Sequence, residues 1–156
     1  MIKKIISGGQ TGVDRAALDA AIQYNIPHGG WCPRGRRAED GIVDARYQLV
    51  ETASHDYNQR TEYNVKDSDG TLILNLGKLE GGTAFTVRIA EAIPKPCLIV
   101  NLARPVDTHG VFTWLAVNKI HVLNVAGPRE SKYPGIYARA KMELDRILDE
   151  SMGQKS

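Results

Sequence analysis

The chain has 156 residues, 42% hydrophobic and 24% charged, so it is long enough for one sizeable core and short for two domains. Its 20 basic and 18 acidic residues give a formal net charge of +2, which argues against a nucleic-acid polymer or a membrane surface as partner. No stretch approaches the ~20 apolar residues of a membrane span. We therefore expect one domain over residues 1–150 and a flexible tail over residues 151–156.

The expected elements alternate between strand and helix along the chain. Apolar and β-branched runs predict five strands, near residues 2–6, 26–30, 70–75, 97–101 and 121–125. Apolar residues at helical spacing predict five helices, near residues 14–24, 57–67, 83–93, 107–118 and 134–150. This alternation predicts an α/β, Rossmann-like fold in three layers: an open parallel sheet of about five or more strands with helices on both faces.

The first strand is followed by a glycine-rich turn, SGGQTGVD, and then by the first helix. Glycines let the backbone come close to a ligand and the helix adds the positive end of its dipole, so this order favours a phosphate site. The spacing matches neither G-x-G-x-x-G nor the Walker motif and specifies no particular nucleotide. The alternative is a tight turn that needs glycine only for its geometry. The expected phosphate cradle consists of Gly8, Gly9, Gln10, Thr11 and Gly12.

The long polar segment 31–56 interrupts the regular alternation. A structureless stretch of this length is uncommon inside a compact α/β domain and is usually functional or disordered. It carries three arginines within PRGRR, just after the second strand, and guanidinium groups suit bidentate phosphate binding. We select Arg34 as a charge partner of the ligand. The alternative is a solvated basic turn paired with Glu39 and Asp40.

A second glycine turn, LEGGT, follows the third expected strand and precedes a helix. If the first and third strands are neighbours, both glycine turns face one pocket at the carboxyl edge of the sheet. We assign Gly81, Gly82 and Thr83 to a second phosphate cradle. Thr83 equally fits an ordinary N-cap.

A further loop, AGPRESK, follows the last expected strand. It brings Arg129 to the same edge of the sheet, where it would add a cation to a pocket floored by backbone N–H groups. We select Arg129 as the second charge partner of the ligand. A helix-entry turn with Pro134 near the first helical position explains much of the same loop without a ligand.

Residue types with metal or redox chemistry form no recognisable site. The four histidines lack a ligand spacing such as H-x-x-x-H, so we expect no metal site. Cys32 and Cys97 lie far apart in the sequence and are expected as reduced thiols. No signal-peptide pattern precedes the first strand, and we expect a cytoplasmic protein.

Several ordered motifs, spread over nearly the whole chain, resemble the molybdenum cofactor carrier protein family. They are SGGQTGVDRAALDAA, GGWCPRGRRAEDG, RTEYNVKDSDGTLIL, GGTAFT and NVAGPRES. The resemblance implies a Rossmann-like fold, a homo-oligomer (dimer or tetramer), and a pocket for the phosphate-bearing molybdenum cofactor (molybdopterin). We therefore expect a carrier that binds a phosphate-bearing small molecule. A nucleotide-sensing module is an alternative.

The same broad superfamily includes the lonely-guy phosphoribohydrolases, formerly called lysine decarboxylases, whose signature resembles P-G-G-x-G-T-x-x-E. This chain keeps the Gly-Thr pair but has Thr86 where the enzymes have glutamate. The change removes the carboxylate expected to stabilise an oxocarbenium-like transition state or to activate water, so binding is favoured over hydrolysis. A phosphoribohydrolase-like enzyme is the alternative, with substitute carboxylates near the expected pocket from Asp14, Glu39, Asp69 or Glu80.

Overall fold

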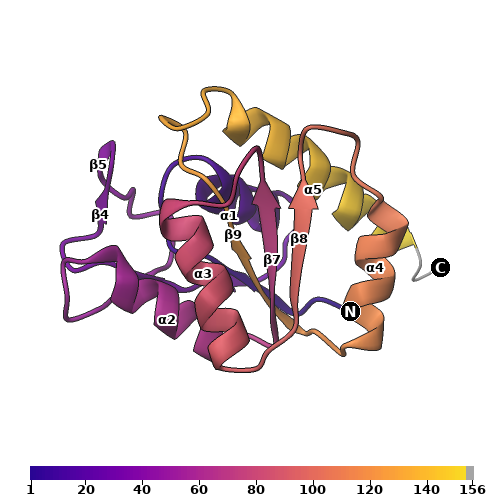
Figure 1. Cartoon of the computed structure of the whole chain (residues 1–156), viewed down its shortest axis with the longest axis horizontal. Coiled ribbons are helices and arrows are strands. Elements are labelled where there is room, and N and C mark those ends of the chain that lie inside the picture. Colours follow the sequence, from indigo (N-terminus) through magenta and orange to yellow (C-terminus); the bar gives the residue numbers. More distant parts are fainter. Residues whose placement is uncertain (154–156) are drawn as a thin grey trace.

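A five-stranded parallel sheet between two layers of helices forms the centre of the molecule (Figure 1). The computed structural model describes residues 1–153. The strands lie in the order β2-β1-β9-β7-β8. Their bounds are β1 (Lys4–Ile6), β2 (His28–Gly29), β7 (Gly70–Asn75), β8 (Cys97–Asn101) and β9 (Val122–Ala126).

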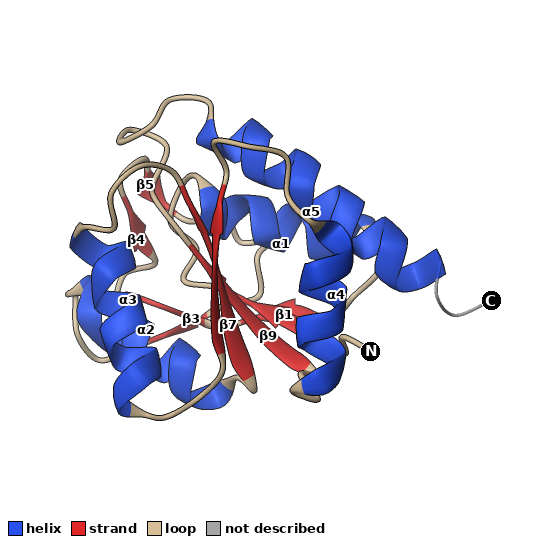
Figure 2. Ribbon diagram, turned by 45° about the vertical axis from the view of Figure 1, so that its right-hand side comes forward, coloured by secondary structure: helices blue, strands red, loops and turns tan. Residues whose placement is uncertain are grey.

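Five helices cover the two faces of this sheet. They are α1 (Val13–Gln23), α2 (Tyr57–Asp67), α3 (Gly81–Ala92), α4 (Thr108–Val117) and α5 (Ile136–Gly153). Helices α1 and α4 both pack against α5 on one face, whereas α2 and α3 pack together on the other (Figure 2). The three-layer α/β fold predicted from the sequence is confirmed, with element ends shifted by a few residues.

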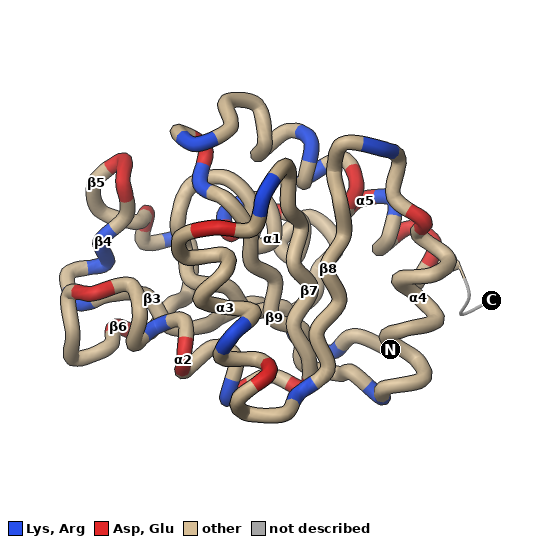
Figure 3. The backbone as a smooth tube through the Cα atoms, in the orientation of Figure 1, with Lys and Arg blue, Asp and Glu red and all other residues tan. Residues whose placement is uncertain are grey.

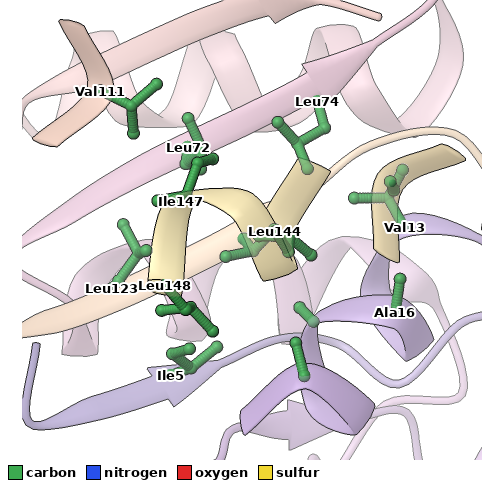
Figure 4. Packing of buried hydrophobic residues seen from close by; sticks show 14 of the residues in the cluster. Ile5, Val13, Ala16, Leu72, Leu74, Val111, Leu123, Leu144, Ile147 and Leu148 are labelled. Atoms are coloured by element: carbon green, nitrogen blue, oxygen red, sulfur yellow. The ribbon is translucent and has the colours of Figure 1, made fainter. Parts of the chain in front are cut away.

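The core lies mainly between the sheet and α5. The fully buried strand β7 contributes Leu72 and Leu74, and the apolar stripe of α5 contributes Leu144, Ile147 and Leu148 (Figure 4). Helix α1 meets the same core mainly through alanines, and small side chains allow a close approach between helix and sheet. This packing fixes the loops after β1, β7 and β9 at the carboxyl edge, because each of these strands contributes buried residues to the core.

The segment 31–56 corrects the expectation of a structureless stretch. Strand β3 (Trp31–Cys32) pairs in parallel with β6 (Val50–Glu51), and β4 (Arg37–Ala38) forms an antiparallel hairpin with β5 (Gly41–Ile42). The guanidinium of Arg36 donates to the backbone carbonyls of Val43, Asp44, Tyr47 and Leu49. A small second core buries Leu18, Cys32, Ala38, Val43, Tyr47 and Leu49. The segment is therefore ordered by one arginine and one apolar cluster.

The order of the strands creates a crevice. Helix α1 leaves β1 on one face and leads to β2 at one side of the sheet, whereas α3 leaves β7 on the other face and leads to β8 at the opposite side. Strand β9 lies between β1 and β7. Ligands of open α/β sheets bind where neighbouring connections diverge in this way, at the carboxyl ends of the strands.

The C-terminal helix reaches further than expected. Residues 151–153 of the predicted tail continue α5, and residues 154–156 lie outside the described residues. Over residues 1–153, none of the helices combines the length and apolar character needed to cross a bilayer.

Substitution of Gly12 tests whether the first glycine turn needs glycine for its close contact with the loop after β9. It is the N-cap of α1 with φ 78°, and a Cβ on it would lie 2.4 Å from the carbonyl oxygen of Pro128. Gly35 has a similar φ of +84° but open space around its Cβ position. In urea denaturation we expect Gly12→Ala to lower the free energy of unfolding by about 3–5 kcal/mol, and Gly35→Ala by only about 1–2 kcal/mol. Equal losses would mean that the contact with the Pro128 carbonyl has no effect.

Candidate functional site

A cavity of about 270 Å³ opens at the carboxyl edge of the sheet. Its walls come from the turn after β1, the end of β9 and its following loop, helix α2, and the first turn of α3. The volume lies just below the range of about 300–1,000 Å³ that is usual for small-molecule pockets. The cavity therefore suits one compact ligand better than a dinucleotide.

The first turn of α3 faces this cavity without a side-chain cap. A Cβ on Gly81 or Gly82 would meet no protein atom within 4 Å. The N-cap residue Glu80 makes no side-chain capping bond and instead pairs with Lys132 at 2.7 Å. The first N–H groups of a helix have no carbonyl partner inside it, so this turn offers amide donors and a positive dipole end. Gly81, Gly82 and Thr83, predicted from the sequence as a second phosphate cradle, all line the cavity.

Arg60 of α2 also lines the cavity. Its Nη1 donates to Oδ2 of Asp14 at 2.9 Å, its Nε donates to the carbonyl oxygen of Tyr57 at 3.2 Å, and its guanidinium carbon lies 5.2 Å from the centre of the Tyr57 ring. A Cβ on Gly8 would lie 1.7 Å from Nη1, so glycine is needed there to admit the guanidinium. Arg60 is therefore a rigidly held cation at the cavity wall.

The partner of Arg60, Asp14, is buried as well. The two side chains are 12% and 7% exposed. Burial raises the pKa of the Asp14 carboxyl, while the charge of Arg60 and the hydrogen bond from the Gln10 amide act in the opposite direction. Removing one member of a buried pair is strongly destabilising, because the other charge is left uncompensated. The Arg60–Asp14 ion pair therefore stabilises the wall of the cavity.

Arg60 was not predicted as a site residue, because the predicted cations came only from loops and Arg60 lies within a predicted helix. The helical spacing of residues 57, 60, 61 and 64 is the signal that could have identified it, since these four residues share one helical face and all line the cavity.

The first glycine turn is mostly filled by protein atoms. Gly8 and Gln10 line the cavity, whereas Gly9, Thr11 and Gly12 do not. A Cβ on Gly9 would lie 2.6 Å from a methyl group of the second core. Together with the contact at Gly12, this favours the geometric role for these two glycines.

Glu39 joins three loops beside the cavity. Its carboxylate accepts hydrogen bonds from the hydroxyl of Thr11 and from the amide and hydroxyl of Ser131, and it lies 3.2 Å from Nε of Arg129. Burial favours the neutral acid, but the hydrogen bonds from Ser131 and Thr11 and the charge of Arg129 lower the pKa of Glu39. We call these four residues the Glu39 latch. The latch ties the β4–β5 hairpin to the loop between β9 and α5.

The two predicted charge partners lie in different places. Arg129 lines the cavity, within the Glu39 latch. Arg34 is exposed and does not line the cavity, because its backbone amide bonds the carbonyl of Ser54 and holds it on the segment between β3 and β4. Lys132, which the sequence analysis did not select, lines the cavity instead. Figure 3 shows basic and acidic residues interspersed along the loops at this edge of the sheet.

The comparisons with known proteins place the fold and site in a family. The family model described as circularly permutated YpsA SLOG matches residues 5–148, nearly the whole chain. The chain belongs to the circularly permutated YpsA SLOG family. A solved structure of a "Putative molybdenum carrier protein" from Syntrophus aciditrophicus SB is 51% identical, with 94% of each chain covered and a TM-score of 0.87. The family predicted from the sequence motifs is therefore confirmed. A search of curated proteins gave no match.

In this member of the YpsA SLOG family, the hydroxyl of Thr86 donates to the carbonyl oxygen of Gly82 at 2.9 Å. Of the carboxylates named as substitutes, Asp14 and Glu80 line the cavity and are ion-paired, and Glu39 belongs to the latch. Asp69 was wrongly expected near the pocket. It precedes β7, and its carboxylate accepts from the amides of residues 121 and 122 at the amino end of β9.

Metal-ligating side chains are scattered over this YpsA SLOG chain. Among residues 1–153, no group of three or more His, Cys, Asp and Glu side chains is placed to hold a metal ion. The two thiols are free within this part of the chain: Cys32 is buried in the second core, and Cys97 is half-buried in β8.

The Glu39 latch predicts a pH-dependent contribution to stability. The pKa of the Glu39 carboxyl in the folded protein lies below the ordinary value of 4.5. Ionised Glu39 therefore stabilises the fold above about pH 4.5, and this contribution is lost as the pH falls through the folded-state pKa. We expect Glu39→Gln to lower the free energy of unfolding by about 1 kcal/mol at pH 7 and by much less at pH 3. Chemical denaturation at both pH values measures this difference.

Glu62→Gln is the matched control, because it makes the same chemical change on the exposed face of α2. Its effect should be small at both pH values. A Glu39→Gln effect that does not change with pH would show that the charge of Glu39 does not stabilise the latch.

Proposed function

We propose that the chain is a carrier that binds one phosphate-bearing small molecule in the cavity, with the phosphate on the first turn of α3. The open space around Gly81 and Gly82 is the observation that carries this proposal. A phosphate at this helix N-terminus would receive amide hydrogen bonds and favourable dipole energy. The first glycine turn offers less room, because protein atoms already occupy the space beside Gly9 and Gly12.

The cations around the cavity support an anionic ligand. Lys132 pairs with Glu80 and Arg129 with Glu39, and their side chains are 26% and 56% exposed. Ion pairs that are open to water contribute little, so a phosphate can replace these carboxylates at small cost. Arg60 is different, because it is buried and remains paired with Asp14.

We propose the molybdenum cofactor (molybdopterin) as cargo rather than as a resident cofactor. The 51%-identical relative is named a putative molybdenum carrier protein. Molybdopterin is a single pterin with one phosphate, and the compact cavity, the α3 turn and the neighbouring Arg129 and Lys132 suit a ligand of that size and charge. The homo-oligomer implied by the resemblance and a cytoplasmic location belong to the same proposal.

Binding without hydrolysis fits the side chains around the cavity. The Thr86 hydroxyl bonds the backbone of its own helix, and a threonine supplies no carboxylate for an oxocarbenium-like transition state. The two carboxylates that line the cavity are each held by a cation. These features favour a carrier over a phosphoribohydrolase.

Isothermal titration with nucleoside 5′-monophosphates tests the phosphate position. We expect Gly82→Val to weaken binding about tenfold or more, because its side chain would cover the amide donors of α3, and a Cβ at this position has open space around it. Arg129→Ala should weaken binding by a similar factor. Arg34→Ala is the matched control and should change the affinity less than twofold, since Arg34 lies outside the cavity.

Far-UV circular dichroism and the urea midpoint check that each variant is folded. Unchanged affinity in a folded Gly82→Val protein would contradict a phosphate on α3. An equal loss in Arg34→Ala and Arg129→Ala would mean that the effect comes from general surface charge.

A further inference from the structure

Gln10 presents a fixed hydrogen-bond donor to the cavity. Its Oε1 accepts from the backbone amide of Thr11 at 3.0 Å and from that of Glu39 at 2.8 Å. Two N–H donors meet one end of the side-chain amide, so that end is the oxygen and the other end is the NH₂ group. Gln10 is only 7% exposed and lines the cavity.

This NH₂ group lacks a protein partner. Over residues 1–153, Nε2 of Gln10 makes no hydrogen bond, although the residue is only 7% exposed. Nε2 is not among the fully enclosed atoms without a partner, so it stays open to the cavity, where water or a ligand can accept from it. A ligand atom that accepts a hydrogen bond would satisfy Gln10.

Arg60 adds a second donor at the same end of the cavity. Its Nε and Nη1 are bonded to Tyr57 and Asp14, whereas its Nη2 makes no hydrogen bond within the described part of the chain. Oδ2 of the neighbouring Asp14 accepts from Arg60 and from the amide of Gln10, and the negative charge of Asp14 is compensated by Arg60. The two N–H groups of Gln10 and Arg60 therefore favour a ligand edge that accepts hydrogen bonds.

We infer that the ligand is a phosphate ester whose far end presents hydrogen-bond acceptors, and that Gln10 selects an oxo-heterocycle over its amino counterpart. The inference rests on the proposed function, because the phosphate on α3 directs the rest of the ligand toward Gln10 and Arg60. In oxopurines the keto oxygen O6 and the ring nitrogen N7 give two acceptors on one edge, and the pterin of molybdopterin likewise carries a keto oxygen that accepts. In adenine an amino group replaces the keto oxygen, so its N–H groups would face the NH₂ group of Gln10 and no hydrogen bond could form between them.

The test compares inosine 5′-monophosphate with adenosine 5′-monophosphate, which carry the same phosphate and ribose. By isothermal titration with the wild-type chain, we expect the inosine nucleotide to bind about tenfold more tightly. Gln10→Glu keeps an oxygen for the Thr11 and Glu39 amides but replaces the NH₂ group by a second oxygen. We expect this variant to lose or reverse the preference.

Gln48→Glu is the matched control, because it adds the same charge at an exposed glutamine and should keep the wild-type preference. The wild-type comparison decides the inference even if Gln10→Glu does not fold. Equal binding of the two nucleotides, or tighter binding of the adenosine nucleotide, would overturn it.

Gly82→Val separates this inference from the proposed function. If the two nucleotides bind with equal affinity and Gly82→Val weakens the binding of both, the phosphate site on α3 is supported and the role of Gln10 in selectivity is contradicted. If neither nucleotide binds to the folded wild-type chain, both proposals are overturned.

Discussion

The position of β9 between β1 and β7 is the constraint on which the candidate site depends. It brings the turn after β1, the loop after β9 and the start of α3 to one cavity, although these segments are far apart in the sequence. Parallel strands with right-handed crossovers send α1 and α3 to opposite faces, and the crevice opens where they diverge. The all-buried strand β7 and the stripe of α5 keep this edge rigid.

The positive charges around the cavity are compensated by carboxylates. Each cation at the cavity already has an acidic partner: Arg60 with Asp14, Arg129 with Glu39, and Lys132 with Glu80. The Arg60–Asp14 pair is largely buried, whereas the other two pairs are more exposed, and under the proposed function a phosphate would replace their carboxylates. Among the described residues, donors at the cavity without a protein partner include the first-turn amides of α3, Nε2 of Gln10 and Nη2 of Arg60. In the proposed complex these N–H groups would position the ligand.

Hydrophobic periodicity predicted the fold well, because burial against the sheet decides where strands and helices form. The loops were harder, since their structure depends on contacts between distant residues. Arg36 and Arg34 look alike in the sequence, yet Arg36 organises the segment 31–56 and Arg34 lies outside the cavity. The two glycine turns also look alike in the sequence. A Cβ on Gly12 would collide with the backbone of another loop, whereas a Cβ on Gly82 would have open space around it. These differences in role depend on which distant residues contact each position in the folded chain, and the local sequence does not show those contacts.

Backbone amide chemical shifts test the phosphate position most directly. In a titration of ¹⁵N-labelled protein with inosine 5′-monophosphate, the account predicts the largest shifts at the amides of Gly82 and Thr83, with small shifts at Gly9 and Gly12. Saturable shifts concentrated at Gly9 and Gly12, with Gly82 and Thr83 unmoved, would contradict it.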